Sequence, residues 1–209
     1  MKPLSIIKLL ICVIAAFVLF SCAQYTPVTE HYEKITFDEF ISRLKAIREI
    51  KGTADISMQA KDVYMSGMAS MKLSPNEYEV KLFALGIPVG EFRERNGVFY
   101  SRPKLKPEEE QLISLCIKNG IFWWMNNVNN VTTDSKYLKI KQPRQQMVLD
   151  RESLMPIEQF IFLSQGSTLH IAYGDVKWLS GIWYPNRITA TLGSYKFTIN
   201  TEDVKFEKY

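Results

Sequence analysis

Few residues of the chain could carry out acid–base or nucleophilic chemistry together. Hydrolysis needs a nucleophile, a base beside it and a group that orients the base, yet the sequence contains only two histidines. His31 lies in a polar stretch near the amino terminus, and His170 lies in the middle of a predicted strand with no obvious constellation of serine and aspartate around it. Neither a glycine-rich phosphate loop nor a histidine pair at metal-ligand spacing is present. We therefore predict a protein that is not an enzyme and that uses no metal or cofactor.

One of the three cysteines follows an apolar segment that predicts export. Residues 9–20 form an uncharged apolar run of about 12 residues, the length of a signal-peptide core and well short of the roughly 20 that cross a bilayer. The run closes with Leu19-Phe20-Ser21-Cys22, which resembles the lipobox where bacteria attach a diacylglyceryl group to the cysteine and cut the chain just before it. This resemblance implies a signal peptide over residues 1–21, a lipidated Cys22 and a tether over residues 22–34.

An ordinary secretory signal or anchor helix with an incidental Cys22 is the alternative. The chain turns polar directly after Cys22, at Gln24 and Thr26, so the apolar run does not reach the length of a membrane span. Cys12 would leave with the signal, which leaves Cys116 without a partner and predicts no disulfide framework and no multi-cysteine metal site. Cys116 lies on an apolar helical face, where a small buried hydrophobe is expected rather than a nucleophile.

Composition predicts one globular domain over residues 35–209. The chain of 209 residues is 46% hydrophobic, which is ordinary for a protein with a real core. Its formal charge of +4 falls to about +2 without Lys2 and Lys8. This near balance argues against nucleic acid as a partner, because nucleic-acid binding normally needs a concentrated basic face.

The elements of this domain follow from hydrophobic periodicity. Thr36 and Glu39 have the spacing of a capping box, and apolar residues at helical spacing predict an amphipathic helix that runs to Ile47. Pro107 opens a second helix, which is expected to stop at Asn119-Gly120. Period-two alternation predicts strands near residues 52–60, 65–73, 78–82, 91–95, 98–101, 137–140, 147–149, 157–163, 168–173, 187–192 and 195–199.

These elements define an α+β fold. About ten or eleven strands in sequence-local hairpins predict one large curved antiparallel sheet with helices against its concave face. The aromatic patch of residues 121–125 is expected to be either core or a lid over a cavity. The Asn-rich stretch after it is expected to be a loop.

The order of elements and two sequence segments resemble the LolB receptor and the wider family of LolA-like lipoproteins. The segments are Tyr78-Glu79-Val80-Lys81-Leu82-Phe83-Ala84-Leu85-Gly86 and residues 169–189, which include Tyr184-Pro185-Asn186-Arg187. The resemblance implies an unclosed barrel whose hydrophobic interior binds acyl chains. It places in that cavity Met58, Met65, Met71, Val80, Leu82, Ile140, Leu149, Ile161, Ile171 and Phe197. The alternative for each of these residues is that it packs a solid core.

The resemblance also implies a membrane contact and a set of partners. It assigns Leu85, with Gly86 and Ile87, to a loop that enters the target membrane. Ala23 directly after the lipidated cysteine favours the outer membrane over the inner. The implied partners of this periplasm-facing monomer are acylated lipoproteins or another lipid cargo, and a periplasmic carrier as donor. The competing hypothesis is a structural or assembly lipoprotein of the same fold that binds a protein partner instead of lipid.

Overall fold

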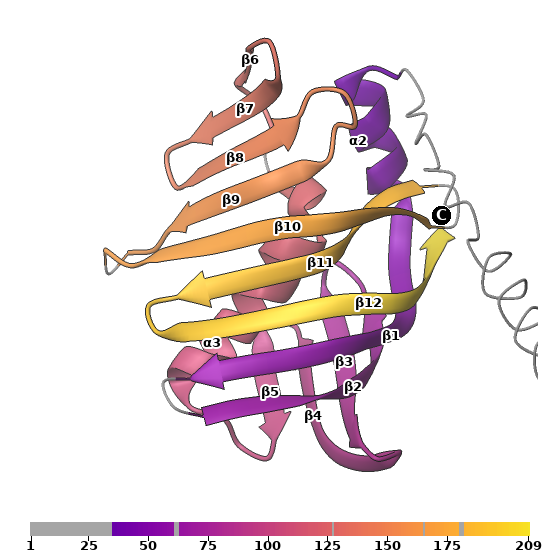
Figure 1. Ribbon diagram of the computed structural model, residues 1–209, viewed down its shortest axis with the longest axis vertical. Coiled ribbons are helices and arrows are strands. Elements are labelled where there is room, and N and C mark those ends of the chain that lie inside the picture. The colour runs from indigo at the N-terminus through magenta and orange to yellow at the C-terminus, as the bar shows by residue number, and fades with distance from the viewer. Residues whose placement is uncertain (1–34, 61–62, 127, 165, 180–181) are drawn as a thin grey trace, which may run out of the picture. The chain divides into compact units, whose positions relative to one another are not determined.

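A computed structural model describes residues 35–60, 63–126, 128–164, 166–179 and 182–209 (Figure 1). The predicted signal peptide, Cys22, Ala23, His31 and the tether therefore lie outside the described residues. The described chain forms one antiparallel sheet of twelve strands in the order β5-β4-β3-β2-β1-β12-β11-β10-β9-β8-β7-β6. Because β5 and β6 lie at opposite edges and do not pair, the sheet is an unclosed barrel, as predicted.

Each strand pairs with a strand next to it in sequence, and β1 pairs in addition with β12. The strands are β1 (Ile47–Ala60), β2 (Val63–Leu73), β3 (Glu77–Ala84), β4 (Ile87–Arg95), β5 (Val98–Arg102), β6 (Val131–Thr133), β7 (Tyr137–Gln142), β8 (Gln145–Asp150), β9 (Pro156–Phe162), β10 (Thr168–Leu179), β11 (Ile182–Leu192) and β12 (Tyr195–Lys208). The twelfth strand, beyond the ten or eleven expected, is β6. Its three residues are all exposed, so it lacks the buried alternation by which a strand is recognised in sequence.

Helix α2 (Phe37–Lys45) precedes the sheet. The Thr36 hydroxyl accepts a hydrogen bond from the Glu39 amide at 3.2 Å, which caps the first turn. Phe40, Ile41 and Leu44 form its buried face. The helix ends two residues earlier than predicted, because Ile47 already pairs with Lys208 as the first residue of β1.

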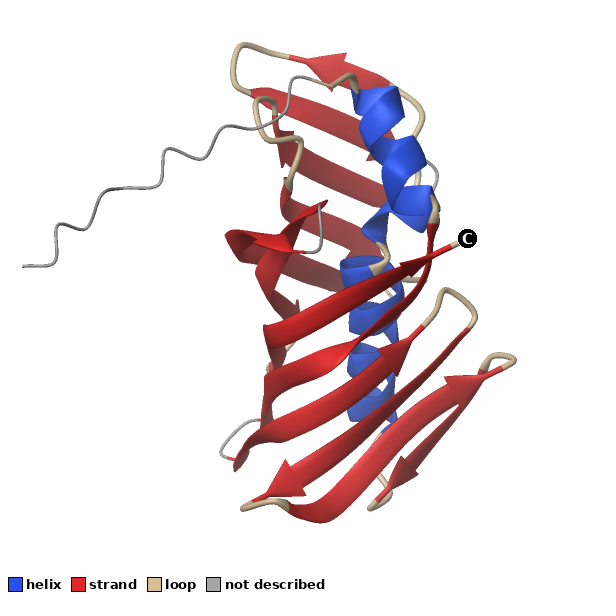
Figure 2. Ribbon diagram, turned by 90° about the vertical axis from the view of Figure 1, so that its right-hand side faces the viewer, coloured by secondary structure: helices blue, strands red, loops and turns tan. Residues whose placement is uncertain are grey.

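A second helical segment lies along the inner face of the sheet (Figure 2). It consists of α3 (Pro107–Leu115), a π-helical turn η1 (Cys116–Ile121) and a 3-10 turn η2 (Trp123–Met125). The predicted stop at Asn119-Gly120 is wrong, since the π turn runs through Gly120. A Cβ on Gly120 would lie only 3.2 Å from the Ile188 side chain, so this glycine allows close packing on the sheet and does not end the helix.

The aromatic patch after η1 belongs to the core. Phe122, Trp123 and Trp124 are all buried, and the two indole rings meet edge to face with centroids 5.9 Å apart. Cys116 is buried below them, as expected, and burial raises the pKa of its thiol to about 12. In the part of the chain that the structure describes, no helix combines the length and apolar character needed to cross a bilayer.

Candidate apolar pocket and its exposed turn

Most of the ten predicted cavity residues are buried, but only some of them line a cavity. Seven belong to the continuous buried core, and Leu82 and Ile161 are partly buried against it; the seven are Met58, Met71, Val80, Ile140, Leu149, Ile171 and Phe197. Four of the ten line an apolar pocket of about 290 Å³; these are Met58, Met65, Leu82 and Phe197. Among the described residues, this apolar pocket lies between the first strands, β1–β5, and α3.

The pocket has a buried floor and an exposed mouth. Ile56, Phe92 and Ile113 are buried floor residues that complete the surface begun by Met58 and Phe197. At the mouth, the side chains of Met65 and Val89 are 48% and 54% exposed. The polar groups around the pocket are Ser66, Ser101, Glu91 and Arg102. Such a lining suits an apolar ligand, and the volume lies at the lower end of the roughly 300–1,000 Å³ of small-molecule sites.

Small residues keep the pocket open. Gly67 lines it, and a Cβ on this residue would lie 2.9 Å from the carbonyl oxygen of Phe83 on the neighbouring strand. The pairing of β3 with β4 shifts register between Leu82 and Phe83, which leaves Val89 as the extra residue of β4. Sequence periodicity could not find Val89 or Ile113, because a bulge and a helix packed across the sheet both break the strand pattern.

The predicted membrane loop is a two-residue turn between β3 and β4. Ala84 pairs with Ile87, and Leu85 and Gly86 between them have φ angles of 52° and 78°. The next hairpin has the same turn at Asn96 and Gly97, with φ angles of 52° and 77°. Asparagine and glycine are the residues that such turns favour, whereas leucine at positive φ is disfavoured by its Cβ.

Leu85 does not pack against the core, since the residue is 101% exposed. Ile87 and Val89 beside it are exposed as well. At the same end of the sheet, β2 begins with exposed Tyr64, Met65 and Met68. We call these six residues the mouth patch: Tyr64, Met65, Met68, Leu85, Ile87 and Val89. Tyr64 and Met68 lie on the opposite face of β2 from Met65, because side chains alternate along an unbroken strand. Exposed apolar residues gathered at one end of a sheet indicate a protein, lipid or membrane contact.

A buried carboxylate fastens the helix over the pocket to the sheet. Glu94 of β4 is 3% exposed and accepts hydrogen bonds from Ser114 of α3 at 2.7 Å and from Tyr78 of β3 at 3.2 Å. Lys118 of η1 forms an ion pair with the same carboxylate. Burial alone would raise the pKa of Glu94, but these partners hold it below its usual value. The network therefore links two strands, α3 and η1.

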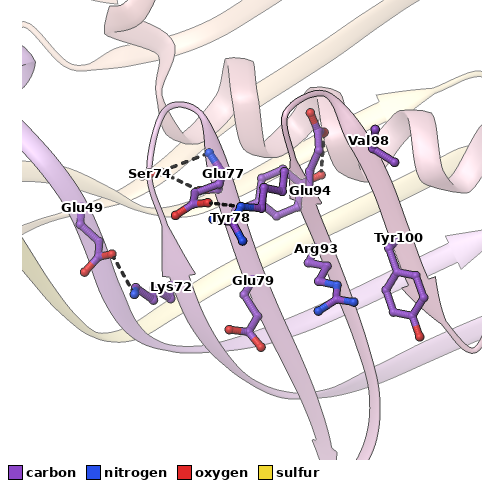
Figure 3. A pocket seen from close by; sticks show the side chains of 11 residues that line it. Glu49, Lys72, Ser74, Glu77, Tyr78, Glu79, Arg93, Glu94, Val98 and Tyr100 are labelled. Carbon is purple, nitrogen blue, oxygen red and sulfur yellow. Dashed lines mark hydrogen bonds and ion pairs between the residues drawn. The ribbon is translucent and has the colours of Figure 1, made fainter.

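A second, polar hollow of about 550 Å³ lies on β1–β5 (Figure 3). Its wall carries charges of both signs, which largely pair with one another. Lys72 lies 3.4 Å from Glu49, Arg95 lies 3.3 Å from Glu77, and the Arg93 guanidinium lies 4.6 Å from the centroid of the Tyr100 ring. This surface was not predicted from the sequence, and its mixed charge favours no single class of ligand.

Groups with catalytic potential are dispersed in the described ranges. His170 stacks on Phe160 with ring centroids 4.6 Å apart and lies 3.4 Å from the Glu158 carboxylate. Within those ranges, no three His, Cys, Asp or Glu side chains are arranged to hold a metal ion.

Solved structures share this fold. A LolA superfamily protein from Nitrosomonas europaea aligns over 84% of this chain and 95% of its own, with a TM-score of 0.56 and 10% identity. A putative outer membrane lipoprotein-sorting protein domain from Vibrio parahaemolyticus aligns over 82% of this chain and 94% of its own, with a TM-score of 0.51 and 12% identity. No family model and no curated protein matches the sequence. The chain therefore has a LolA/LolB-like fold, as its sequence predicted.

Proposed function

We propose that this protein is a monomeric outer-membrane lipoprotein that faces the periplasm and handles acyl chains. Lipidation of Cys22 anchors it, and the pocket beneath α3 takes up an acyl chain of a lipoprotein or a related lipid. A periplasmic carrier protein delivers that cargo, and the Leu85 turn enters the target bilayer where the cargo is released. The lipobox-like segment, the apolar pocket and the fold shared with the Vibrio lipoprotein-sorting domain support this proposal.

The observation that carries the proposal is the residue type at position 85. A turn with both central residues at positive φ is served best by asparagine and glycine, and the chain uses that pair one hairpin later. At position 85 it instead holds a leucine that is fully exposed and conformationally disfavoured. A side chain that contributes nothing to the folded core is explained by a contact outside it.

The position of the turn supports the same role. Leu82 and Val89, which flank the turn in β3 and β4, both line the pocket. An acyl chain that leaves the pocket past Met65 would therefore emerge among the residues of the mouth patch. Methionine suits such a passage, because its unbranched thioether adapts to chains of varying shape. Pocket and turn together form a route from the interior to a bilayer.

Mass spectrometry of the protein purified from its native membrane tests the uptake of cargo. We expect a co-purified acylated molecule, and we expect the purified protein to take up a fluorescent fatty acid. Leu82→Trp should fill the pocket and abolish uptake, since Leu82 is a half-buried lining residue. Val98→Trp is the matched control, because it adds the same ring to an exposed site outside the apolar pocket. Equal uptake by both variants would contradict the proposed pocket.

The second candidate is a structural or assembly lipoprotein that binds a protein partner. The observation in its favour is the filled interior, where Phe122, Trp123 and Trp124 occupy space that a larger lipid cavity would need. This candidate predicts no acylated molecule after purification and no uptake of the fatty-acid probe. It also predicts that Leu85→Glu, which leaves the fold intact, reduces capture of an envelope protein and not release of lipid.

A further inference from the structure

A second exposed aromatic site lies at the end of the sheet opposite to Leu85. Trp178 of β10 and Trp183 of β11 face each other across the ladder, and their rings meet edge to face with centroids 5.3 Å apart. Trp178 is 53% exposed, although a tryptophan normally contributes most when it is buried. We call Lys177, Trp178 and Trp183 the tryptophan hairpin.

The strand directions separate this hairpin from the pocket mouth. β1 and β3 both run antiparallel to β2, so the start of β1 at Ile47 and the end of β3 at Ala84 lie at opposite ends. β12 runs antiparallel to β1 and β11, and β11 runs antiparallel to β10. The end of β10 therefore lies with Ile47, α2 and the carboxyl terminus (Figure 1). Along a strand of 14 residues such as β1, the two ends are about 45 Å apart.

Aromatic and basic side chains gather at this end. On the inner face of the same strands, the buried ring of Tyr184 packs on Phe206 of β12 with ring centroids 5.3 Å apart, so β12 lies beside the hairpin. Two residues further, exposed Lys208 and Tyr209 end the chain. Tryptophan and tyrosine are enriched at the headgroup level of bilayers, and lysines near an anionic surface add electrostatic attraction.

We propose that the tryptophan hairpin sits in the headgroup region of the bilayer that carries the lipid anchor and holds the pocket mouth away from that bilayer. The proposal rests on the proposed lipidation of Cys22. The described chain begins with Ile35 and α2 at the hairpin's end of the sheet, so a short tether brings this end to the membrane. In this orientation the mouth patch faces the periplasm, where a donor can reach it. A tether of residues 22–34 spans up to about 45 Å when extended, so the domain can also invert to bring Leu85 to the bilayer.

Tryptophan fluorescence of the full lipidated protein in vesicles of phosphatidylcholine and phosphatidylglycerol tests the orientation. Trp123 and Trp124 are buried and give a constant background. In a Trp183→Phe variant, brominated lipids should quench Trp178 several-fold relative to unbrominated lipids. In the matched reporter, Leu85→Trp with the tryptophan hairpin intact, brominated lipid should quench no more than in the parent protein, while aqueous iodide should quench more strongly.

The outcomes separate the two proposals. Flotation with the vesicles comes first, and failure of the lipidated protein to float would contradict the anchor at Cys22 and not the role of the hairpin. If the protein floats, quenching at position 178 without quenching at position 85 supports the proposed orientation. Quenching at position 85 alone, at both positions or at neither overturns it. Circular dichroism of each variant establishes that the exposed substitutions leave the sheet intact.

Discussion

Replacing Leu85 by asparagine should stabilise the folded domain while weakening its contact with lipid. Leucine at a φ of 52° carries a steric cost of about 1 kcal/mol or more, which asparagine reduces through local hydrogen bonding. The leucine side chain is fully exposed, so its removal loses no burial in the core. We expect a gain of about 0.5–1 kcal/mol in the free energy of unfolding, or roughly 1–4 °C in Tm for a domain of this size.

The same substitution should reduce affinity for bilayers. Burial of a leucine side chain contributes about 1.5–3 kcal/mol, and every 1.4 kcal/mol is a factor of ten in affinity. The loss of Leu85 should therefore weaken partitioning into vesicles about 10- to 100-fold. The assay uses a Cys22→Ser background, in which the predicted anchor is absent. The tryptophan hairpin is the same in both proteins, so the difference in partitioning between them measures the contribution of the turn.

Asn96→Leu is the matched control for both measurements. It places leucine in a turn with the same backbone angles on the next hairpin, outside the mouth patch. We expect it to lower the free energy of unfolding by about 0.5–1 kcal/mol and to leave partitioning into vesicles unchanged. The reasoning about position 85 is refuted if Leu85→Asn lowers the Tm, or if it binds vesicles as tightly as the parent protein.

Three further predictions concern the packing of the domain. Lys118→Met should lower the free energy of unfolding, measured in urea at pH 7, by about 2–3 kcal/mol. This is less than the loss expected on breaking a fully buried ion pair, because the Lys118 side chain is 43% exposed. The lowered pKa of Glu94 stabilises the parent protein above about pH 4.3, and this contribution is lost as the pH falls. In Lys118→Met, burial should dominate and raise the pKa of Glu94, so the variant should become more stable as the pH falls. An identical dependence of stability on pH in the two proteins would contradict the Glu94 network. Cys116→Ser should lower the free energy of unfolding by about 1–3 kcal/mol through a buried, unpaired hydroxyl, and Cys116→Ala should lower it by less. Equal losses would contradict the unpaired hydroxyl and show that it finds a hydrogen-bond partner. Gly52→Ala should lower the free energy of unfolding by about 3 kcal/mol or more, since its Cβ would lie 1.9 Å from the Asp203 carbonyl oxygen. An unchanged Tm would show that the backbone of β12 can shift to accommodate the methyl group.

The sequence predicted most strands of the sheet but not how the segments on its inner face pack. Period-two alternation located most strands because each buries one face, and Asn96-Gly97 located a hairpin turn that the structure contains. The residues of β6 are all exposed, so no alternation marked them. The helix stop at Gly120 was mistaken because a glycine can serve close packing as well as chain reversal. Local sequence does not distinguish these two uses.

Only part of the pocket lining was predicted, because local sequence does not show what packs against an inward-facing residue. Strand periodicity placed Met58 and Ile140 on the same inner face, and this much is intrinsic to each strand. Whether an inward residue meets a cavity or another side chain depends on the segment packed against it. Phe122 and Trp124 fill the region that they cover, whereas α3 leaves space beside Ile113. That difference arises from tertiary packing between residues distant in sequence.

Side-chain size on the first strands explains why the hollow lies where it does. Leu82 pairs with Ala69 on one side and with Gly90 on the other, and Gly67 pairs with Ile56 in the adjoining row. Because these residues have small side chains, they leave space on the inner face beneath α3. A larger side chain could not fill that space from either glycine, since its Cβ would lie too close to a backbone carbonyl oxygen. Empty volume in a core normally costs stability, so its retention beside an exposed, disfavoured Leu85 is consistent with a ligand that fills it.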